Sequence, residues 1–306
     1  MIKAITVTNY RGDSLRMELT RPEESGFIIH KITGIGPGEA NVNVTEISTG
    51  DGGLFNSARV PSRNIVISLK YMMFGSFTIE DVRQMSYRYF PIKQKCKLLI
   101  ETDNRKAEIE GYVETNDPDI FSKDEGSNIS IICPNPFFYS AGDDGVNTTV
   151  FSGVNPEFEF PFMNDSLTEN LIVMGDIQHN TERSVLYFGD VETGVKIVIH
   201  ALGPATKIAI YNTRTREIMK IDTDKIASLT GSGIKTGDDI VIETTKGRKS
   251  ILLLRDGRTT NILNCLEKNA DWFQLAKGDN LFAYTAETGS TNLQFKIENR
   301  IVYEGV

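Results

Sequence analysis

The chain of 306 residues carries a formal net charge of −8, with 40% hydrophobic and 24% charged residues. This composition is ordinary for a globular protein with one large or two medium domains, and it excludes a mainly disordered chain. The strongly basic balance of nucleic-acid-binding proteins is absent, so we expect no specific nucleic-acid binding.

Three cysteines, Cys96, Cys133 and Cys265, lie far apart in apolar or amphipathic segments. An odd and widely spaced set is typical of reduced packing residues in a reducing cytoplasm. The first residues contain no apolar stretch of signal-peptide length, and no window approaches about 18 uncharged apolar residues. We therefore expect neither a signal peptide nor a membrane span.

Strand patterns dominate residues 1–140. Alternating or continuous apolar runs, separated by Gly, Asn and Asp, predict strands over 2–9, 27–35, 40–48, 63–72, 96–103, 106–115 and 129–133. Asp103 and Asn104 predict a tight hairpin between two of these strands.

One segment of this first part has a helical pattern. Thr78 can cap a helix together with Asp81, and Val82, Met85 and Tyr89 then fall on one face. Pro91 ends the pattern, so we expect a helix of about three turns.

Two prolines and three aromatic residues follow the strand predicted over 129–133. Because Pro134 and Pro136 cannot donate to a sheet, Phe137, Phe138 and Tyr139 are expected to leave the strand as an extended arm. The aromatic side chains either plug a core or dock onto another surface.

Large apolar residues become sparse just after Ser140, which places a domain boundary between 140 and 141. Strand patterns then recur at intervals near ten residues, over 171–178, 184–190, 195–202, 207–213, 217–222, 239–245, 250–256, 280–287, 293–299 and 301–306. That spacing predicts an antiparallel β-sandwich or jelly roll over 141–306, and no alternation of strand and helix is visible.

No pattern for catalysis, metal binding or a cofactor is found. None of the histidines, His30, His179 and His200, has a second histidine at metal-ligand spacing, and no nucleophile elbow, P-loop or zinc-protease motif occurs. The acid pairs Asp143-Asp144 and Asp238-Asp239 lie beside glycines, where aspartates usually form turns, so a glycosidase is disfavoured. We expect no enzyme.

The single tryptophan, Trp272, allows two interpretations. An exposed ring on a β-sandwich can stack on a sugar, whereas a buried ring would be a core or corner residue. The second interpretation is favoured because tryptophan is highly buried on average.

Several segments in order along the chain resemble the distal tail protein family of long-tailed bacteriophages, the siphovirus-type tail component. They are residues 52–67, 77–95, 109–122, 129–140, 186–222 and 236–253. The resemblance implies a mainly β protein: an N-terminal β-barrel-like domain with one helix over 1–140, of the kind used by tail-tube proteins, and a C-terminal galectin-like or carbohydrate-module-like sandwich over 141–306.

The resemblance also implies a structural adaptor at the distal tail tip. Six copies would form a ring around the DNA channel and join the tail tube protein to the tail hub, with receptor-binding proteins attached in many family members. Assembly would take place in the host cytoplasm, and no cofactor or membrane is implied. The alternative is a carbohydrate-binding protein that engages host cell-surface polysaccharide through the C-terminal sandwich and Trp272.

Residues for the ring interface follow from the segments that carry the resemblance. The polar and aromatic residues expected at contacts between subunits are Asn56, Arg59, Arg63, Asn64, Arg83, Tyr87 and Arg88. Arginine is enriched at protein interfaces relative to lysine, although a solvated surface is an equal alternative for these arginines. Phe137, Phe138 and Tyr139 are expected to pack against the ring or the second domain.

Overall fold

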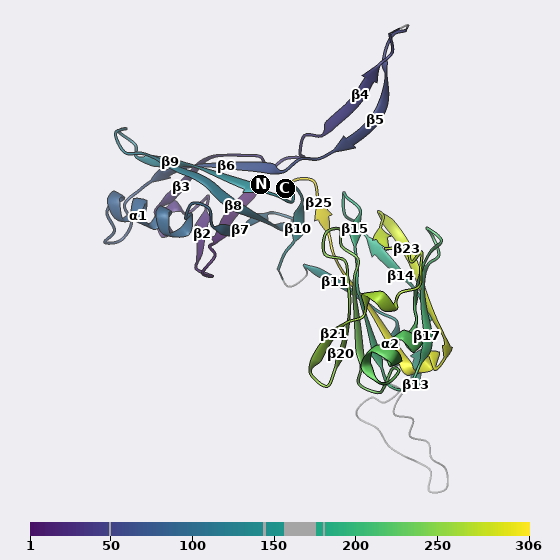
Figure 1. The fold of residues 1–306 in the computed structure, drawn as a ribbon. Helices are drawn as coiled ribbons and strands as arrows, with labels where there is room; N and C mark the ends of the chain where they lie inside the picture. Colours follow the sequence, from purple (N-terminus) through teal and green to yellow (C-terminus); the bar gives the residue numbers. More distant parts are fainter. Residues whose placement is uncertain (49, 143–144, 156–175, 180) are drawn as a thin grey trace, which may run out of the picture. The chain divides into compact units, whose positions relative to one another are not determined.

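The computed structural model describes residues 1–48, 50–142, 145–155, 176–179 and 181–306. The chain divides into two compact units: unit 1 contains Met1–Gly145 and Val302–Val306, and unit 2 contains Val146–Ile301 (Figure 1). The chain therefore leaves unit 1, builds unit 2 and returns. Residues 302–306 belong to unit 1, so they do not complete the C-terminal sandwich as the pattern over 301–306 predicted. The strand predicted over 171–178 is described only from Asp176 onward.

Unit 1 is built on one nine-stranded antiparallel sheet. Its main path runs β2 (Ser14–Glu18), β1 (Ile2–Thr8), β7 (Lys95–Thr102), β8 (Lys106–Asp119), β9 (Gly126–Cys133), β6 (Arg63–Tyr71) and β3 (Phe27–Thr33). Two short strands, β10 (Phe138–Ser140) and β25 (Val302–Tyr303), pair with each other, and β10 also pairs with β8. A 3-10 turn, Pro22–Glu24, precedes β3.

The sheet of unit 1 is open rather than barrel-like. In the described part of the chain, β2 and β3 end the hydrogen-bonded path and no pairing joins them. The expected barrel closure is thus wrong, while the antiparallel strands and the tight β7–β8 hairpin, closed by the Thr102 amide donating to the Arg105 carbonyl, are confirmed.

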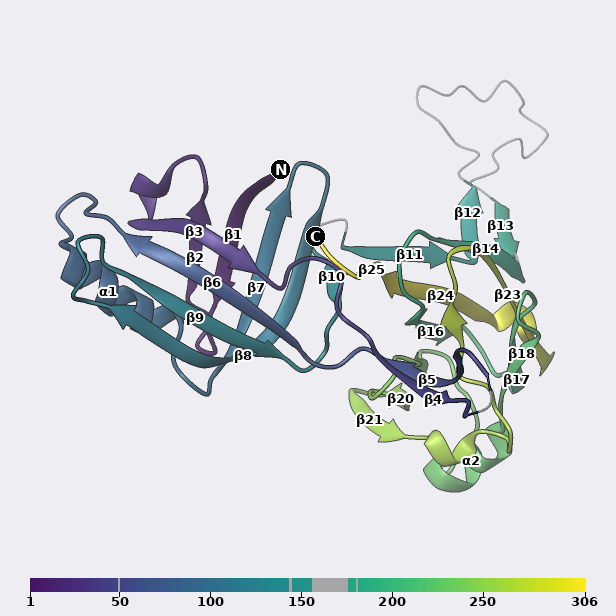
Figure 2. The same ribbon diagram turned by 90° about the horizontal axis from the view of Figure 1, so that it is seen from above.

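The helix α1 (Ile79–Tyr89) lies where the sequence placed it, against one face of this sheet (Figure 2). Thr78 and Asp81 form a reciprocal capping box, which satisfies two backbone amides at the helix start. Val82 is fully buried, and Met85 and Tyr89 pack partly buried against the same core. The capping pair and the apolar spacing together explain why this local segment is helical.

Unit 2 contains two antiparallel sheets that share one core. The larger sheet has the order β11 (Val146–Val150), β24 (Leu293–Arg300), β16 (Lys196–Ala201), β19 (Asp239–Glu243), β20 (Ser250–Arg255) and β21 (Arg258–Asn261). The smaller sheet has the order β14 (Glu182–Tyr187), β23 (Gly278–Thr288), β17 (Thr206–Asn212) and β18 (Glu217–Ile221).

Short elements complete unit 2. They are the paired strands β12 (Ser152–Asn155) and β13 (Asp176–His179), the paired strands β15 (Thr193–Gly194) and β22 (Gln274–Leu275), and the 3-10 turns Leu263–Cys265 and Ser290–Asn292. A second helix, α2 (Thr223–Thr230), was not predicted, although Asp222 caps its start and Gly231 ends it in the left-handed conformation.

The core of unit 2 lies between its two sheets, where alternate residues of the facing strands are buried. Tyr284 and Phe295, one from each sheet, stack with ring centroids 3.9 Å apart. The mainly β class and the antiparallel sandwich predicted for the C-terminal half are confirmed. Among the described residues, no helix is long and apolar enough to cross a membrane.

Candidate functional site: an exposed arm and the junction at its root

A two-stranded arm extends away from the sheet of unit 1 (Figure 1). It consists of β4 (Asn41–Glu46) and β5 (Gly53–Arg59), and every described residue of both strands is exposed. A lone hairpin of this kind buries too little apolar surface to be stable by itself in water. The exposed apolar side chains of the arm are therefore a candidate contact surface.

One face of the arm is apolar. Val42 pairs with Ala58 and Val44 with Phe55, and directly opposite residues of an antiparallel pair lie on the same face. Val44 and Phe55 are 49% and 67% exposed; Leu54 pairs with Thr45, so it lies on the opposite face, and it is 62% exposed. Contiguous exposed apolar side chains of this kind mark protein interaction surfaces.

Asn56 and Arg59, both expected at the ring interface, lie on β5 of this arm. Asn56 Nδ2 donates to Thr45 Oγ1 at 2.7 Å, which fastens the two strands at the register shift next to Val44. The sequence thus indicated two polar residues of the arm but not its apolar pair, Val44 and Phe55. The run 52–60 lacks regular alternation because of the register shift, and this hid the second strand.

Arg63 lies at the root of the arm and is 7% exposed, so it is not the surface residue that the sequence suggested. Its guanidinium donates to four carbonyl oxygens: those of Pro136 at 2.6 Å, Gly34 at 2.9 Å, Glu304 at 2.6 Å and Gly36. The guanidinium also lies 4.9 Å from the centroid of the Phe138 ring. Burial lowers the pKa of Arg63, but the ordinary value is so high that the group stays charged.

These four carbonyls come from three different segments. Gly34 and Gly36 belong to the turn that leads into the arm, Pro136 precedes β10, and Glu304 follows β25. The Val306 amide also donates to the Ile35 carbonyl, at 2.9 Å. Gly34 has φ +81°, and a Cβ there would lie 2.1 Å from the Asn64 carbonyl oxygen, so only glycine fits at this point of the root. Arg63 therefore acts within its own chain, holding the arm root, the exit segment and the C-terminal residues together.

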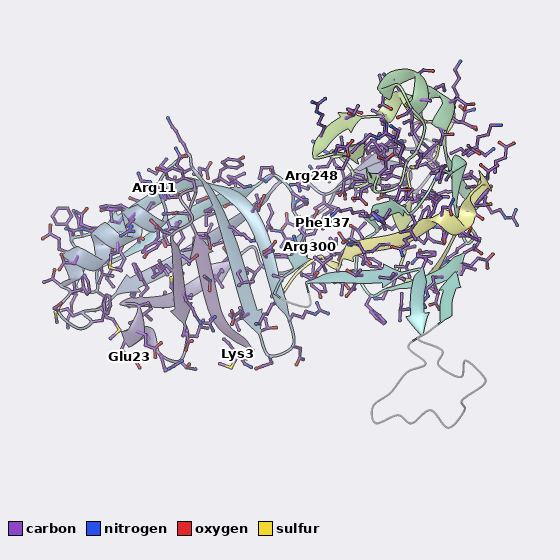
Figure 3. All side chains as sticks on the ribbon, turned by 90° about the horizontal axis from the view of Figure 1, so that it is seen from below. Lys3, Arg11, Glu23, Phe137, Arg248 and Arg300 are labelled. Atoms are coloured by element: carbon purple, nitrogen blue, oxygen red, sulfur yellow. The ribbon has the colours of Figure 1, made fainter. Side chains whose placement is uncertain are left out.

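The aromatic segment is also part of unit 1. Phe138 is fully buried in its core, so the interpretation as a core plug is correct for this residue. Tyr139 pairs with Val302 and Glu108 through its backbone, and its hydroxyl accepts a hydrogen bond from Asn135 Nδ2 at 2.7 Å. Phe137, labelled in Figure 3, is half-buried. Residues 137–139 are therefore part of unit 1, and the connection to unit 2 begins after them.

The remaining residues expected at the ring interface lie on the helix and on β6. Arg83 is mostly buried and paired with Glu125 at 3.1 Å, whereas Arg88 is exposed and paired with Asp13 at 3.1 Å. Tyr87 is 37% exposed. Asn64 Oδ1 accepts a hydrogen bond from the Ser130 hydroxyl at 3.0 Å on the outer face of the sheet.

Trp272 is half-buried and packs against the core of unit 2. The ammonium nitrogen of Lys249 lies 5.0 Å from the ring centroid, so a cation occupies one face of the ring. A sugar stacking on this face would have to displace Lys249. The favoured interpretation, a core or corner residue, fits this setting better than an open platform.

The acid pairs that the sequence singled out are held by neighbouring side chains where the structure describes them. Asp143 and Asp144 lie outside the described residues; Asp238 pairs with Arg255 at 2.5 Å, and the Asp239 carboxylate accepts a hydrogen bond from His200 Nδ1 at 2.7 Å. In the described part of the chain, no group of three or more His, Cys, Asp or Glu side chains could hold a metal ion.

All three cysteines are buried and unpaired, as expected for packing residues. Burial raises the pKa of the Cys96 thiol to about 12 and that of Cys133 to about 11, which keeps both protonated and unreactive at neutral pH.

The ion pair between Asp238 and Arg255 fastens the loop that follows α2. Burial alone would raise the pKa of Asp238, but hydrogen bonds from Arg255 and from the Lys235 amide outweigh it and hold the pKa below its usual value. Arg255 also donates to the Gly233 carbonyl at 2.7 Å and to the Ser232 hydroxyl at 2.8 Å.

This pair predicts a pH dependence of the stability of unit 2. The pKa of Asp238 is lower in the folded state than in the unfolded state. Its carboxylate therefore contributes fully to the free energy of unfolding above the unfolded pKa of about 3.9, and this contribution is lost as the pH falls through the folded-state pKa. We expect Asp238→Asn to lower the free energy of unfolding by about 1–3 kcal/mol at pH 7, and the difference from wild type to shrink toward pH 2. Urea unfolding at a series of pH values measures this; a difference that stays constant with pH would contradict it.

The chain is similar in fold to solved structures from the adsorption apparatus of bacteriophages. The Dit protein of phage SPP1, described as a paradigm of the hub adsorption apparatus in phages infecting Gram-positive bacteria, superposes with a TM-score of 0.65 at 15% identity, covering 98% of this chain and 99% of that one. A chain of the phage P2 baseplate, in its activated conformation with calcium, superposes with a TM-score of 0.52 at 12% identity, covering 98% of each chain. No protein-family model matches the chain, and no curated protein matches it in sequence.

The similarity to both structures extends over nearly the whole chain, so unit 1 and unit 2 have counterparts in each. The mainly β fold implied by the resemblance to distal tail proteins is thereby confirmed, apart from the closure of the first sheet into a barrel.

Proposed function

We propose that the chain is a structural protein of a bacteriophage tail tip, in which six copies form a ring around the DNA channel. The ring joins the tail tube to the tail hub and to the receptor-binding proteins of the adsorption apparatus. The observation that carries this proposal is the exposed arm with its apolar face, in a chain that shares its fold with phage hub and baseplate proteins.

The arm suits a ring because a ring requires head-to-tail contacts between two different patches on each subunit. The apolar face around Val44 and Phe55 supplies one patch, and its partner is a different surface of the next copy. The edge strands β2 and β3, which end the path of the described sheet, offer unpaired backbone groups for further contacts. Asn56, Arg59, Asn64, Arg83, Tyr87 and Arg88 stay in the proposed interface, whereas buried Arg63 does not.

The electrostatics and the chemistry of the chain are in keeping with an adaptor. A channel that passes DNA should not hold phosphates, and the chain is acidic overall. The proposal includes no turnover and no cofactor. The protein would be assembled in the host cytoplasm and then reside at the tail tip of the virion.

The solution mass tests this proposal. Six copies of a 34.1 kDa chain have a mass of about 205 kDa, which light scattering coupled to size exclusion can measure over a range of protein and salt concentrations. We expect this species to grow with protein concentration and to show a central hole in negative-stain images. A single species of 34.1 kDa at every concentration would contradict a self-assembling ring.

A further inference from the structure

The arm is joined to the sheet of unit 1 by two irregular segments. Residues 34–40 connect β3 to β4 and residues 60–62 connect β5 to β6, and neither segment contains a helix or strand. The first segment contains Gly34, Gly36 and Gly38, and glycine leaves the backbone many conformations unless other contacts fix it. These two segments, here called the arm root, therefore need partners if the arm is to hold one direction.

The partners come from Val302–Val306, a segment that follows unit 2 along the chain and belongs to unit 1. The Glu304 carbonyl accepts a hydrogen bond from Arg63 Nη2 at 2.6 Å, and the same guanidinium binds two carbonyls of the arm root. The Val306 amide donates directly to the Ile35 carbonyl at 2.9 Å. The segment is thus hydrogen-bonded to the arm root both directly and through Arg63.

Gly305 lies between these two hydrogen bonds, in close contact with the arm root. A Cβ at this position would be 2.8 Å from the carbonyl carbon of Gly36 and 2.9 Å from the Pro37 nitrogen. Its φ lies outside the left-handed region, so the close approach of two backbones, and not strain, requires glycine here. A larger residue would have to push the segment away from the arm root.

The other end of the segment is anchored in the sheet. Val302 and Tyr303 form β25 and pair with β10, and Val302 is 3% exposed. The Tyr303 ring packs against the core of unit 1, and the Arg105 guanidinium lies 4.6 Å from its centroid. Residues 304–306 are therefore held against the arm root from a fixed starting point.

We propose that residues 302–306 are a strap that fixes the arm root and so sets the direction in which the arm leaves unit 1. An arm with one direction loses less conformational entropy when a partner covers its apolar face, which strengthens that contact. This gain in affinity rests on the proposed role of the arm in the ring, whereas the fixing of the arm does not. Because the strap follows unit 2 along the chain, the arm is fixed only after unit 2 has been synthesised.

The direction of the arm can be measured by pulsed electron–electron double resonance on the full chain. Spin labels are placed at Glu23→Cys, in the turn Pro22–Glu24, and at Glu46→Cys on the arm, at protein concentrations where light scattering shows the single chain. The three native cysteines are buried, so the label reacts at the introduced ones. With the native strap we expect one narrow distribution of distances between the two labels.

Two changes to the strap should broaden this distribution. Gly305→Val forces the strap away from the backbone of the arm root. Val306→Pro removes the amide that donates to Ile35, whereas Val306→Ala keeps this amide and should leave the distribution narrow.

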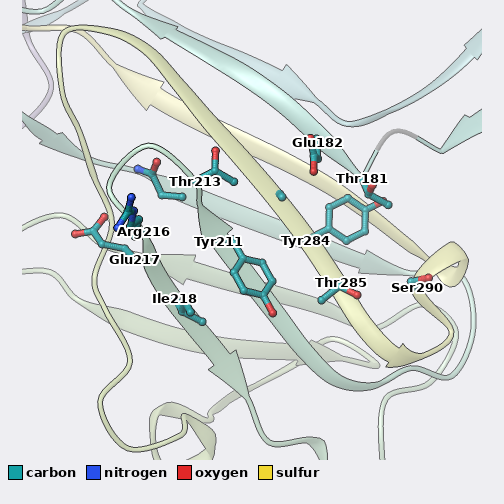
Figure 4. Close-up of a pocket in the computed structure, with 12 residues that line it drawn as sticks. Thr181, Glu182, Tyr211, Thr213, Arg216, Glu217, Ile218, Tyr284, Thr285 and Ser290 are labelled. Carbon is teal, nitrogen blue, oxygen red and sulfur yellow. The ribbon is translucent and has the colours of Figure 1, made fainter.

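The matched control adds bulk where there is room for it. Ala283 borders a hollow of about 540 Å³ on the outer face of the smaller sheet of unit 2, which Tyr211 and Thr285 also line (Figure 4). Ala283→Val should therefore leave the label distances unchanged. A narrow distribution in both Gly305→Val and Val306→Pro, or equal broadening in Ala283→Val, would overturn the strap.

The assembly mass separates the strap from the ring. Gly305→Val should need at least about tenfold more protein to assemble, because fixing the backbone of even one freed residue on binding has a cost of that size. If the label distances broaden while assembly stays like wild type, the strap is supported and the role of the arm in the ring is wrong. If the label distances stay narrow, the strap is wrong whatever the assembly mass.

Discussion

Replacing both Val44 and Phe55 by serine is expected to abolish assembly of the proposed ring. The two residues form a cross-strand pair on the apolar face of the arm and are 49% and 67% exposed in the single chain. Truncating central apolar anchors of an interface costs about 2 kcal/mol or more each, so the double variant should need at least about 100-fold more protein to assemble. The fold of the monomer should be unaffected, because exposed substitutions usually change stability by less than about 0.5 kcal/mol.

The measurement is the mass by light scattering as a function of protein concentration. The matched control replaces two exposed apolar residues of unit 2, Phe188 and Leu229, by serine; they are 61% and 56% exposed. This control should assemble like wild type. If the arm variant keeps the wild-type assembly curve, or if the control loses assembly equally, the arm is not the interface.

Arg63→Met is expected to lower the stability of unit 1 by about 3–5 kcal/mol, since it removes a charged donor from four carbonyls of the arm root, the exit segment and the C-terminal residues. Methionine can fill much of the space but donates no hydrogen bond. Arg63→Lys should recover only part of the loss, because an ammonium group cannot reproduce the planar fork that reaches several acceptors at once.

Thermal and urea unfolding of the full chain measure this effect. Arg59→Met is the control, because Arg59 is the same residue type on the exposed arm and should change stability by less than about 0.5 kcal/mol. An unfolding free energy of Arg63→Met within that margin of wild type would show that the junction is not needed for stability. Hydrogen exchange of the arm root and of residues 302–306 should increase together in Arg63→Met if Arg63 couples these segments.

The helix and the strands that lie in the interiors of the sheets could be predicted because their causes are local. Thr78 and Asp81 are three residues apart, and the side chain of each accepts a hydrogen bond from the backbone amide of the other at the start of the helix. In β6, buried and less buried residues alternate with a period of two. The second helix could have been predicted from Asp222 and Gly231, which are again local signals. The second strand of the arm could not, because it buries no face and its register shift breaks the alternation.

For the candidate site as for the fold, local features follow from the sequence, whereas contacts between distant residues do not. The sequence by itself determined the mainly β class, the position of α1 and many of the strands in both units, because propensity, capping and apolar periodicity act over a few residues. Only the tertiary structure decided that the described sheet of unit 1 is open and that Val302 and Tyr303 return to β10. It also decided that Arg63 is buried among backbone carbonyls from three separate segments. Each of these depends on pairing between residues far apart in the chain, and a strand pattern specifies which face is buried but not which strand becomes its neighbour.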